Sequence, residues 1–315
     1  MDKLTVVILN YRTPEMTVRC AETALKALPD APSRLIIVEN GSGDGSDEIL
    51  GRWHQQHKAK DQIDLVVSAT NKGFSGGNNL GLAKAQSDYV LLLNSDAFLQ
   101  PDSLTSLLKA ADETPKAGLI HPTLIDPDGT PQISQFRDFK PTTELLGASN
   151  LGMIAKLFPK AVTAIPLTSN EAPHWVSFAA VLIRRSMIDE IGGMDDGFFL
   201  YYEDAEYCRR ARQAGWSIHH AKDAFVVHER GGSSPVKKLS KSKKRLPTYY
   251  YESRSRYYQL HYGKAGLWFA NMLWYGERLI AYARFLAFQK PNPVCQKAAQ
   301  DIWRGFGKDV NEHAR

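Results

Sequence analysis

A short apolar run at residues 89–93 constrains the fold of this chain more than any other feature. Tyr89 to Leu93 are all apolar or aromatic, and polar residues ending in Asp96 follow at once. An unbroken run of this length is typical of a strand buried on both faces, as in a parallel sheet. A carboxylate just past such a strand lies where open α/β folds bind ligands. Asp96 is therefore expected to be a metal ligand or a cap of the next helix.

The order of strand and helix repeats four times in the first part of the chain. Strands are predicted at 4–9, 34–38, 63–67 and 89–93, each followed by a helical segment, at 14–28, 49–53, 79–85 and 101–113. This alternation predicts an α/β fold with a parallel sheet and right-handed crossovers. The polar loops that follow the four strands, near Asn10, Glu39, Asn71 and Asp96, should then meet at one edge of the sheet.

The pattern changes after residue 117. A hairpin is predicted at 118–133 around the turn 126–129, whereas 135–172 give mixed signals. Further elements are predicted as strands at 174–183, 216–220 and 224–227 and helices at 186–191 and 203–214. A flexible glycine run at 231–234 follows His228 and ends the compact part.

The composition excludes several classes of protein. A length of 315 residues permits one large domain with an appendage, and 43% apolar with 23% charged residues is typical of a globular core. The first apolar run is too short for a signal peptide. Three scattered cysteines indicate neither a disulfide framework nor a clustered metal site. Together these features favour a cytoplasmic protein.

The loops at the predicted sheet edge carry side chains suited to a nucleotide. Glu39 can accept a hydrogen bond from a base imide, Asn71 and Asn78 offer amides, and Gly73 allows close backbone approach. Asp96 can hold a divalent cation, which typically takes one or two carboxylates plus phosphate oxygens and water. Each residue alone is more often ordinary turn chemistry, but four polar loops at one edge favour a site.

A second acidic cluster begins at Glu203 and Asp204, after an aromatic run. Acids in a first helical turn commonly just complement the helix dipole. Because the apolar run places this turn against the core, a partly desolvated carboxylate here can act as a general base. His228 is equally compatible with a structural role and with metal or phosphate binding.

Taken together, these motifs resemble family 2 glycosyltransferases of the GT-A type, close to bacterial rhamnosyltransferases. They occur in family order over residues 4–232, at 6–11, 36–46, 71–78, 92–96, 192–195 and 202–206. The resemblance implies a Rossmann-like, mostly parallel sheet flanked by helices. It places a GT-A catalytic domain at 1–232, with a donor half at about 1–113 and an acceptor half at about 114–232.

The resemblance also implies the reaction and the role of each residue. An inverting enzyme would move a sugar, rhamnose before others, from a nucleotide-diphosphate donor (dTDP-rhamnose or a UDP-sugar) to a glycan or lipid-linked acceptor in cell-surface polysaccharide synthesis. Asp204, beside Glu203, would be the general base, and Asp96 with His228 would hold Mg²⁺ or Mn²⁺. Donor-binding residues are implied at Asn10, Tyr11, Arg12, Glu39, Asn71, Gly73, Phe74, Asn78, Asn94, Ser95 and Asp96.

Two positions depart from the family pattern. The DXD-like motif reads Asn94-Ser-Asp96, with one carboxylate fewer, which leaves more of the metal binding to His228 or to the substrate phosphates. Residues 177–180 lack the glycine that similar enzymes carry after the middle strand, and bulkier side chains there change the fit of the sugar or acceptor.

The C-terminal part is predicted to be a basic loop followed by helices. Residues 233–247 carry six cations and no acid, which predicts a mobile linker, a lid over the donor phosphates or a patch for anionic lipid. Residues 248–315 form a helical appendage. Its apolar stretch 265–288 is interrupted by charges, so it does not span a membrane. It either lies on the inner membrane's cytoplasmic face or packs on the catalytic domain or on a second subunit of a homodimer.

Three rival functions make different demands on the sequence. An oxidoreductase needs a G-x-G-x-x-G loop after the first strand, and this chain has none there. A nucleotidyltransferase needs a basic, Gly-rich loop at that place, where only Arg12 is basic. A catalytically silent nucleotide-sugar-binding or scaffold protein is compatible with the reduced Asn-Ser-Asp motif. No nucleic-acid partner is expected.

Overall fold

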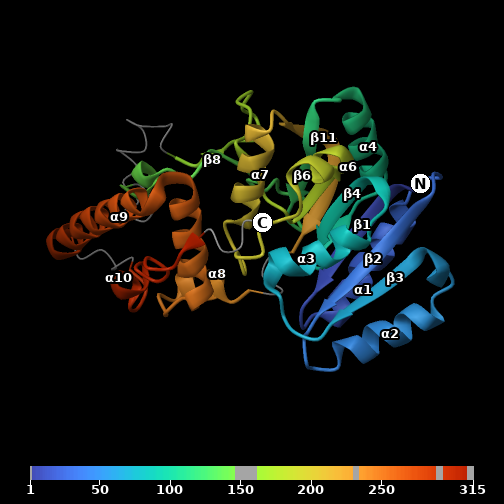
Figure 1. Cartoon of the computed structure of the whole chain (residues 1–315), viewed down its shortest axis with the longest axis horizontal. Coiled ribbons are helices and arrows are strands. Elements are labelled where there is room, and N and C mark those ends of the chain that lie inside the picture. The colour runs from blue at the N-terminus through green and yellow to red at the C-terminus, as the bar shows by residue number, and fades with distance from the viewer. Residues whose placement is uncertain (1, 146–161, 230–233, 289–293, 311–315) are drawn as a thin grey trace.

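The fold is built on a large sheet with helices on both faces (Figure 1). A computed structural model describes residues 2–145, 162–229, 234–288 and 294–310. Within these, eight strands form the main sheet in the order β3-β2-β1-β4-β10-β6-β11-β5. Their bounds are β1 Asp2–Asn10, β2 Ser33–Asn40, β3 Ile63–Ser68, β4 Ser87–Asn94, β5 Ala97–Leu99, β6 Ala117–Ile125, β10 Ala180–Arg184 and β11 Ser217–His228.

The helices and the remaining strands complete the architecture. The helices are α1 Pro14–Ala27, α2 Ser46–Gln56, α3 Gly73–Lys84, α4 Ser103–Glu113, α6 Arg185–Ile191, α7 Glu203–Gln213, α8 Val236–Lys241, α9 Thr248–Phe288 and α10 Ala298–Asp301. The 3₁₀ turns in the described ranges are η1 Lys60–Gln62 and η2 Pro141–Leu145. A small second sheet has the order β8-β7-β9, formed by β7 Gln135–Phe136, β8 Ala164–Ile165 and β9 Trp175–Val176.

The main sheet is mostly parallel, as the sequence predicts. β1 pairs in parallel with both β2 and β4, and β6 pairs in parallel with β11. Only β10 and β5 run against their neighbours. Because the chain leaves β1 toward β2 and β3 and then returns to pair β4 on the other side, the strand order reverses between β1 and β4. Ligands of open α/β sheets bind outside the carboxyl ends of strands at such a point.

The residues of β4 explain why this strand reads as an unbroken apolar run. Successive side chains of a strand point to opposite faces. Tyr89, Leu91 and Leu93 lie in the core formed with α1 and α4, whereas Val90 and Leu92 lie in the core formed with α3, α6, α7 and α9. Both faces of β4 are therefore buried, and its register with β1 brings Asn94 opposite Leu9.

The third helix begins earlier than its sequence predicts. Residues 71–78 read as a glycine-rich turn, but α3 already starts at Gly73. The glycines serve close packing inside the helix: a Cβ on Gly81 would lie 2.3 Å from Cγ1 of Val7 in β1. The prediction of a turn was wrong because the glycines are needed for a different reason: a side chain at these helix positions would clash with residues of the sheet.

Three strand predictions in the second half were also wrong. The single strand expected at 174–183 divides into β9 and β10, which belong to different sheets. The first half of the hairpin expected at 118–133 is the long strand β6. Its second half lies within the described residues but forms no strand, and it pairs with β6 only through an isolated bridge between Pro131 and Ile125. The two strands expected at 216–227 are one strand, β11, with an irregularity between Ala221 and Phe225.

The C-terminal part is helical, and it lies beside α7 at one end of the molecule (Figure 1). The segment 233–247, expected as a loop, contains the helix α8, whose Val236 belongs to one hydrophobic cluster with Leu246 and Trp274. Helix α9 is two helices joined at Gly263, where φ is 68°. Residues 231–233 of the expected flexible glycine run lie outside the described residues. None of the described helices combines the length and apolarity of a membrane span.

Candidate active site

The loops after β2 and β3 are joined by the side-chain amides of Asn40 and Asn71 at the carboxyl edge of the sheet. The Nδ2 of Asn40 donates to Oδ1 of Asn71 at 3.1 Å and to the carbonyl of Gly73 at 2.9 Å. Its Oδ1 accepts from the backbone N–H of Lys72. Asn71 in turn accepts from the N–H of Gly73. The expected convergence of these loops is therefore present.

Ser42 ties the loop after β2 to the loop after β1. Its hydroxyl accepts from Nδ2 of Asn10 at 3.3 Å and from the backbone N–H of Arg12 at 3.0 Å. The Nε of Arg12 donates to the carbonyl of Ser42. Arg12 holds a left-handed backbone with φ of 58°, and its guanidinium lies over the ring of Tyr11. Asn10 is fully buried, which makes it part of the frame of the site.

Glu39 is buried and turned toward its own loop. Its two carboxylate oxygens accept from the backbone N–H groups of Gly41 at 3.0 Å and Ser42 at 2.8 Å. Gly41 has a φ of 64°, and a Cβ there would lie 2.3 Å from the backbone of Thr70. Glu39 thus stabilises the turn that follows β2. The sequence had predicted that Glu39 accepts a hydrogen bond from the base of a nucleotide. Its contact with a base stays a prediction.

The start of α3 brings the two halves of the chain together. The N–H of Phe74 donates to the carbonyl of Phe199, and a Cβ on Gly73 would lie 2.3 Å from that same oxygen. Asn78 is buried and donates to the carbonyl of Phe74 within the helix. The segment that leads to Glu203 therefore lies directly against the donor-side loop after β3.

Asp96 and His228, expected as metal ligands, lie beside each other although they are 132 positions apart in the sequence. Oδ1 of Asp96 is 3.5 Å from Nε2 of His228. Asp96 is buried, and its carbonyl accepts from the N–H of Glu229, which ties the ends of β4 and β11 together. Ser95, also buried, shares a hydrogen bond with Thr13 of the loop after β1, and the N–H of Asn94 donates to the carbonyl of Ala179.

Gln132, which sequence reasoning missed, sets the orientation of the His228 ring. Its Nε2 donates to Oδ1 of Asp126 at 2.7 Å and to the carbonyl of His228 at 2.8 Å, which fixes which end of the amide is the oxygen. Its Oε1, 3.1 Å from Nδ1 of His228, can then only accept. In a neutral imidazole the proton would then be held at Nδ1, which leaves the lone pair of Nε2 on the side of Asp96. This is how metal-binding histidines are usually held.

Glu203 and Asp204 form the first turn of α7. Glu203 is buried, and its Oε2 accepts no hydrogen bond from the residues that the structure describes. Burial raises the pKa of Glu203 well above its usual range, with the neighbouring Asp204 adding to the shift. Burial also raises the pKa of Asp204, to about 7, against the opposing hydrogen bond from the N–H of Ala205. Desolvation therefore outweighs the favourable helix terminus at both acids.

The chain between β9 and β10 connects the two acidic sites. Tyr207 of α7 contacts the ring of Phe178. One residue further, the carbonyl of Ala179 accepts from the N–H of Asn94, two residues before Asp96. One helical turn after Asp204, Cys208 of the same helix is hydrogen-bonded to the backbone of Val176, the last residue of β9. Segment 177–179 thus runs from the acid-bearing helix to the end of β4, which supports placing both acids at one edge.

Two residues of the site were missed because their role depends on partners distant in sequence. Ser42 and Gln132 read as ordinary loop residues, and their contacts are made with Asn10, Arg12 and His228. Ser42 stands in a Gly-rich turn, where a hydroxyl is common whether or not it has a partner. Ser42 lies within the family motif at 36–46, but nothing in the sequence marks Gln132.

Comparison with known proteins gives a consistent family match. The family described as Glycosyl transferase family 2 matches residues 5–192. N-acetylglucosaminyl-diphospho-decaprenol L-rhamnosyltransferase of Mycobacterium tuberculosis is 26% identical over 250 residues, which cover 74% of this chain and 78% of that protein. Rhamnosyltransferase WbbL of Escherichia coli K12 is 26% identical over 192 residues, covering 59% of this chain and 70% of that protein.

A solved structure has the same fold. Mannosyltransferase PcManGT from Pyrobaculum calidifontis, solved with GDP-Man and Mn²⁺, has a TM-score of 0.55 at 15% identity, over 93% of this chain and 77% of that one. At this identity the likeness concerns the fold alone. The family match ends at residue 192, so it includes Asp96 but neither the acids of α7 nor His228.

Proposed function

The chain belongs to glycosyl transferase family 2 and is a glycosyltransferase of the GT-A fold, and on that premise we propose an inverting reaction. A sugar, rhamnose before others, passes from a nucleoside-diphosphate donor to a hydroxyl of a glycan or lipid-linked acceptor in cell-surface polysaccharide synthesis. The rhamnosyltransferase names of the two relatives support this choice of sugar. The observation that carries the proposal is the pairing of Asp96 and His228 at the strand-order reversal.

Asp204 takes the general-base role in this proposal. A sugar hydroxyl is a poor nucleophile until a base accepts its proton as it attacks. A base works best when its pKa lies near the working pH, and burial raises the pKa of Asp204 to about 7. A single attack on the anomeric carbon, from the side opposite the leaving diphosphate, inverts that carbon. Glu203 is the more buried of the two acids, so it is less accessible to an acceptor hydroxyl than Asp204.

The donor set at Asp96 and His228 fits Mg²⁺ or Mn²⁺. It offers one carboxylate and one imidazole whose Nε2 lone pair is turned toward the carboxylate. Among the described side chains, no group of three or more His, Cys, Asp or Glu is gathered, so diphosphate oxygens and water complete the set. When bound, the cation would neutralise charge on the leaving diphosphate. The Mn²⁺ in the mannosyltransferase structure supports this choice.

A ligand screen tests the proposed function. With Mn²⁺ present, dTDP, UDP and their sugars should raise Tm, because a ligand at about 100 times its Kd adds about 2.7 kcal/mol of stability. The best nucleotide sugar is then incubated with lipid-linked glycan acceptors, and the product is analysed by mass and anomeric configuration. EDTA is the control for the cation.

The outcomes of this screen separate the rival functions. Acceptor-dependent release of nucleoside diphosphate with an inverted product supports the transferase. Binding of a nucleotide sugar with no turnover would instead identify a catalytically silent binding protein. No stabilisation by any nucleoside diphosphate would overturn the proposal.

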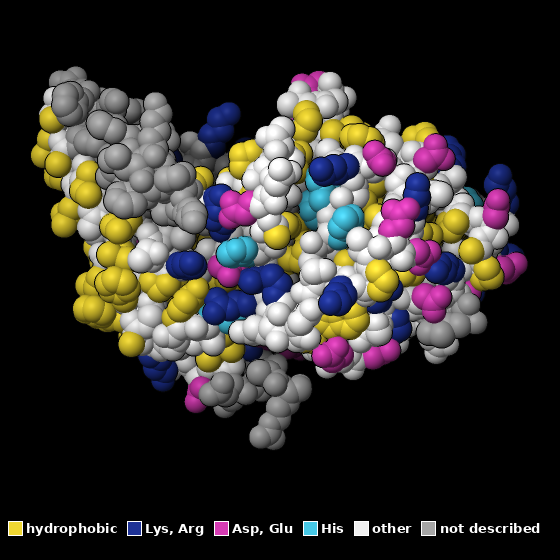
Figure 2. All heavy atoms as spheres, turned by 90° about the horizontal axis from the view of Figure 1, so that it is seen from above, with side chains coloured by type: hydrophobic (Ala, Val, Ile, Leu, Met, Phe, Trp, Pro, Cys, Tyr) yellow, Lys and Arg dark blue, Asp and Glu magenta, His cyan; other side chains and the backbone are white. Residues whose placement is uncertain are grey.

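The second half of α9 is proposed to lie on the cytoplasmic face of the inner membrane. Hydrophobic side chains gather at the end of the molecule that α9 forms (Figure 2). The exposed large apolar residues there are Trp268, Phe269, Leu279, Ile280, Tyr282 and Leu286. At helical spacing these six fall on one side of α9. Helix α8 and the turn after it add exposed lysines at 237, 238, 241, 243 and 244. An apolar face with aromatic side chains and nearby cations is typical of an interfacial helix.

Binding to phosphatidylglycerol vesicles checks this attachment. Replacing Trp268 and Leu279 by glutamate should weaken binding at least about tenfold, because burying one such side chain contributes about 1.5–3 kcal/mol. Val67→Glu is the matched control, since Val67 is 55% exposed but lies on β3. If the parent chain does not bind vesicles but forms dimers, and the variant with glutamate at 268 and 279 does not dimerise, the apolar face of α9 is a homodimer interface instead.

A further inference from the structure

The loop 195–202, which leads into Glu203, lies against the first half of α9. The rings of Tyr249 and Phe199 are 5.2 Å apart, and Tyr250 contacts Tyr201 and Tyr202 at ring distances of 5.6 and 6.1 Å. The hydroxyl of Ser253 donates to the carbonyl of Leu200 at 3.0 Å. Positions 249, 250, 253, 256 and 257 lie at helical spacing, so one face of α9 holds this loop along its length.

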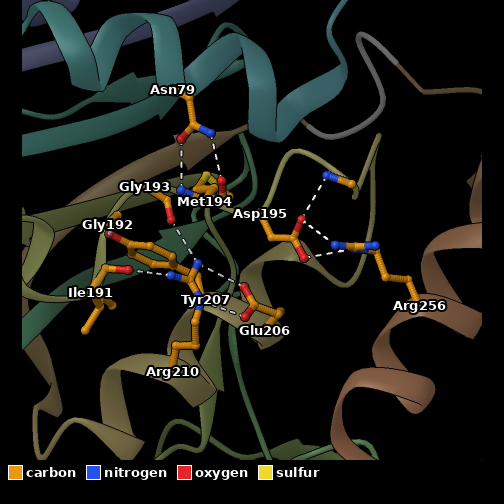
Figure 3. Close-up of polar contacts among 11 residues, drawn as sticks. Asn79, Ile191, Gly192, Gly193, Met194, Asp195, Glu206, Tyr207, Arg210 and Arg256 are labelled. Atoms are coloured by element: carbon orange, nitrogen blue, oxygen red, sulfur yellow. Dashed lines mark hydrogen bonds and ion pairs between the residues drawn. The ribbon is translucent and has the colours of Figure 1, made fainter. Parts of the chain in front are cut away.

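Arg256 makes the strongest of these contacts (Figure 3). Its Nε and Nη2 each donate to one oxygen of Asp195 at 2.9 Å, and both side chains are only 9% exposed. The loop closes over the guanidinium at Gly197, where a Cβ would lie 2.4 Å from the Cζ of Arg256. The guanidinium also lies over the ring of Phe198. Paired charges in this bidentate geometry restrict the position of the loop strongly.

The residues just before the acids hold a backbone that needs support. Tyr201 and Tyr202 have φ angles of 73° and 70°, a left-handed conformation that bulky residues rarely adopt. Such a conformation persists only where the surrounding structure determines it. Here the surrounding groups include Tyr250 and Tyr257 of α9 and the hydroxyl of Ser234, which is 2.7 Å from that of Tyr201. The direction in which α7 begins therefore depends on contacts from α9.

The segment just before this loop is held by other elements. The side-chain amide of Asn79 in α3 makes a pair of hydrogen bonds with the backbone of Met194, at 2.7 and 2.8 Å. Arg210 of α7 donates to the carbonyls of Ile191 and Gly193 (Figure 3). Residues 191–194 are thus fixed to α3 and α7 independently of α9. Only the part from Asp195 onward relies on Arg256.

We propose that Arg256 is a positioning residue for Asp204, acting through Asp195 and the loop 195–202. This inference rests on the proposed base role of Asp204. In this proposal the first half of α9 supports the active site by holding the loop that precedes Asp204, although the sequence predicted α9 to be part of an appendage. The donor-side loops have bonds of their own, such as those of Asn40 and Ser42, and they touch loop 195–202 through Gly73 and Phe74. Loss of Arg256 should therefore change donor binding much less than kcat.

Steady-state kinetics of Arg256→Gln, Asp195→Asn and the double variant test the proposal. Each single variant should lower kcat about 10–100-fold while KM for the donor stays within about twofold, because a small displacement of a catalytic group is costly. The two losses should not add in the double variant, since both remove one bond. Arg256→Lys, which keeps the charge, should recover part of kcat. Amide exchange at residues 198–206 should be faster in Arg256→Gln.

Arg254→Gln is the matched control, because Arg254 is buried on the same helix but pairs with Glu144. It should leave kcat and the exchange at 198–206 unchanged. Parent-like kcat in Arg256→Gln, additive losses in the double variant, or unchanged exchange at 198–206 would each overturn the proposal. A parent chain that turns over no donor would refute the proposed function and the catalytic part of this inference. Amide exchange would still decide whether Arg256 holds the loop.

Discussion

Replacing Asp204 by asparagine is expected to lower kcat by about 10²–10⁴-fold, the usual contribution of a general base. Asparagine keeps the shape of the side chain but cannot accept the proton of the acceptor hydroxyl. KM and Kd for the donor should change little, because the donor-side loops are held by Asn40 and Ser42 and not by α7. The measurement is initial rate over a range of donor and acceptor concentrations, together with nucleotide titration.

The pH dependence of the parent enzyme provides a second readout for Asp204. A base is active when deprotonated, and burial raises the pKa of this carboxyl to about 7. kcat should therefore rise as the pH increases through about 7, and Asp204→Asn should lose this ascending limb. A raised pKa in the folded state also means that ionisation costs stability as the pH rises through that value. The variant should therefore match or exceed the parent in Tm above pH 7.

Two further variants make the Asp204 experiment decisive. Asp196→Asn is the matched control, because Asp196 is an exposed acid in the preceding loop, and its kcat should equal that of the parent. Glu203→Gln tests the neighbouring acid, which should tolerate the change better than Asp204. Near-parent turnover by Asp204→Asn, with loss of turnover in Glu203→Gln, would transfer the base role to Glu203.

The sequence predicted the elements whose role follows from burial alone. A strand buried on both faces must be apolar at every position. The apolar run therefore predicted β4, and the end of that run predicted that Asp96 lies at the carboxyl edge of the sheet. The four strand–helix repeats fixed the sheet edge, and the family and fold expected from the motifs are confirmed. The resemblance implied Asp96 and His228 as metal ligands, and the structure places their side chains 3.5 Å apart.

Features that depend on a partner distant in sequence could not be predicted. The Gly73–Gly81 region reads as a turn, because nothing in it records that Val7 needs the space. The break at 177–179 lies within an apolar run and arises because Ala179 must pair with Asn94. Arg256 reads as one cation among many, and only the fold brings Asp195 to it. Apolar periodicity reports that a residue is buried, but not which neighbour it meets.

Replacing Asp96 by alanine is expected to abolish most of the affinity that Mn²⁺ adds to nucleoside-diphosphate binding. Asp96 is the carboxylate in the proposed cation site, and His228 alone is a poor site for a cation that prefers oxygen ligands. Calorimetric titration of dTDP and UDP, with Mn²⁺ and with EDTA, measures this added affinity directly. The parent should bind more tightly with the cation than with EDTA, and this difference should be largely lost in Asp96→Ala. Transfer should be lost with it.

Gln132→Leu distinguishes a cation site from a simple ion pair between Asp96 and His228. Without Gln132 the His228 ring loses the partner that fixes its proton at Nδ1, and loss of such a partner typically weakens metal binding about 10–100-fold. Asp88→Ala is the matched control for Asp96→Ala, since Asp88 is an exposed acid at the other end of β4. If Asp96→Ala retains the full gain in affinity from Mn²⁺, the cation is bound elsewhere. If only Gln132→Leu retains it, His228 is not one of its ligands.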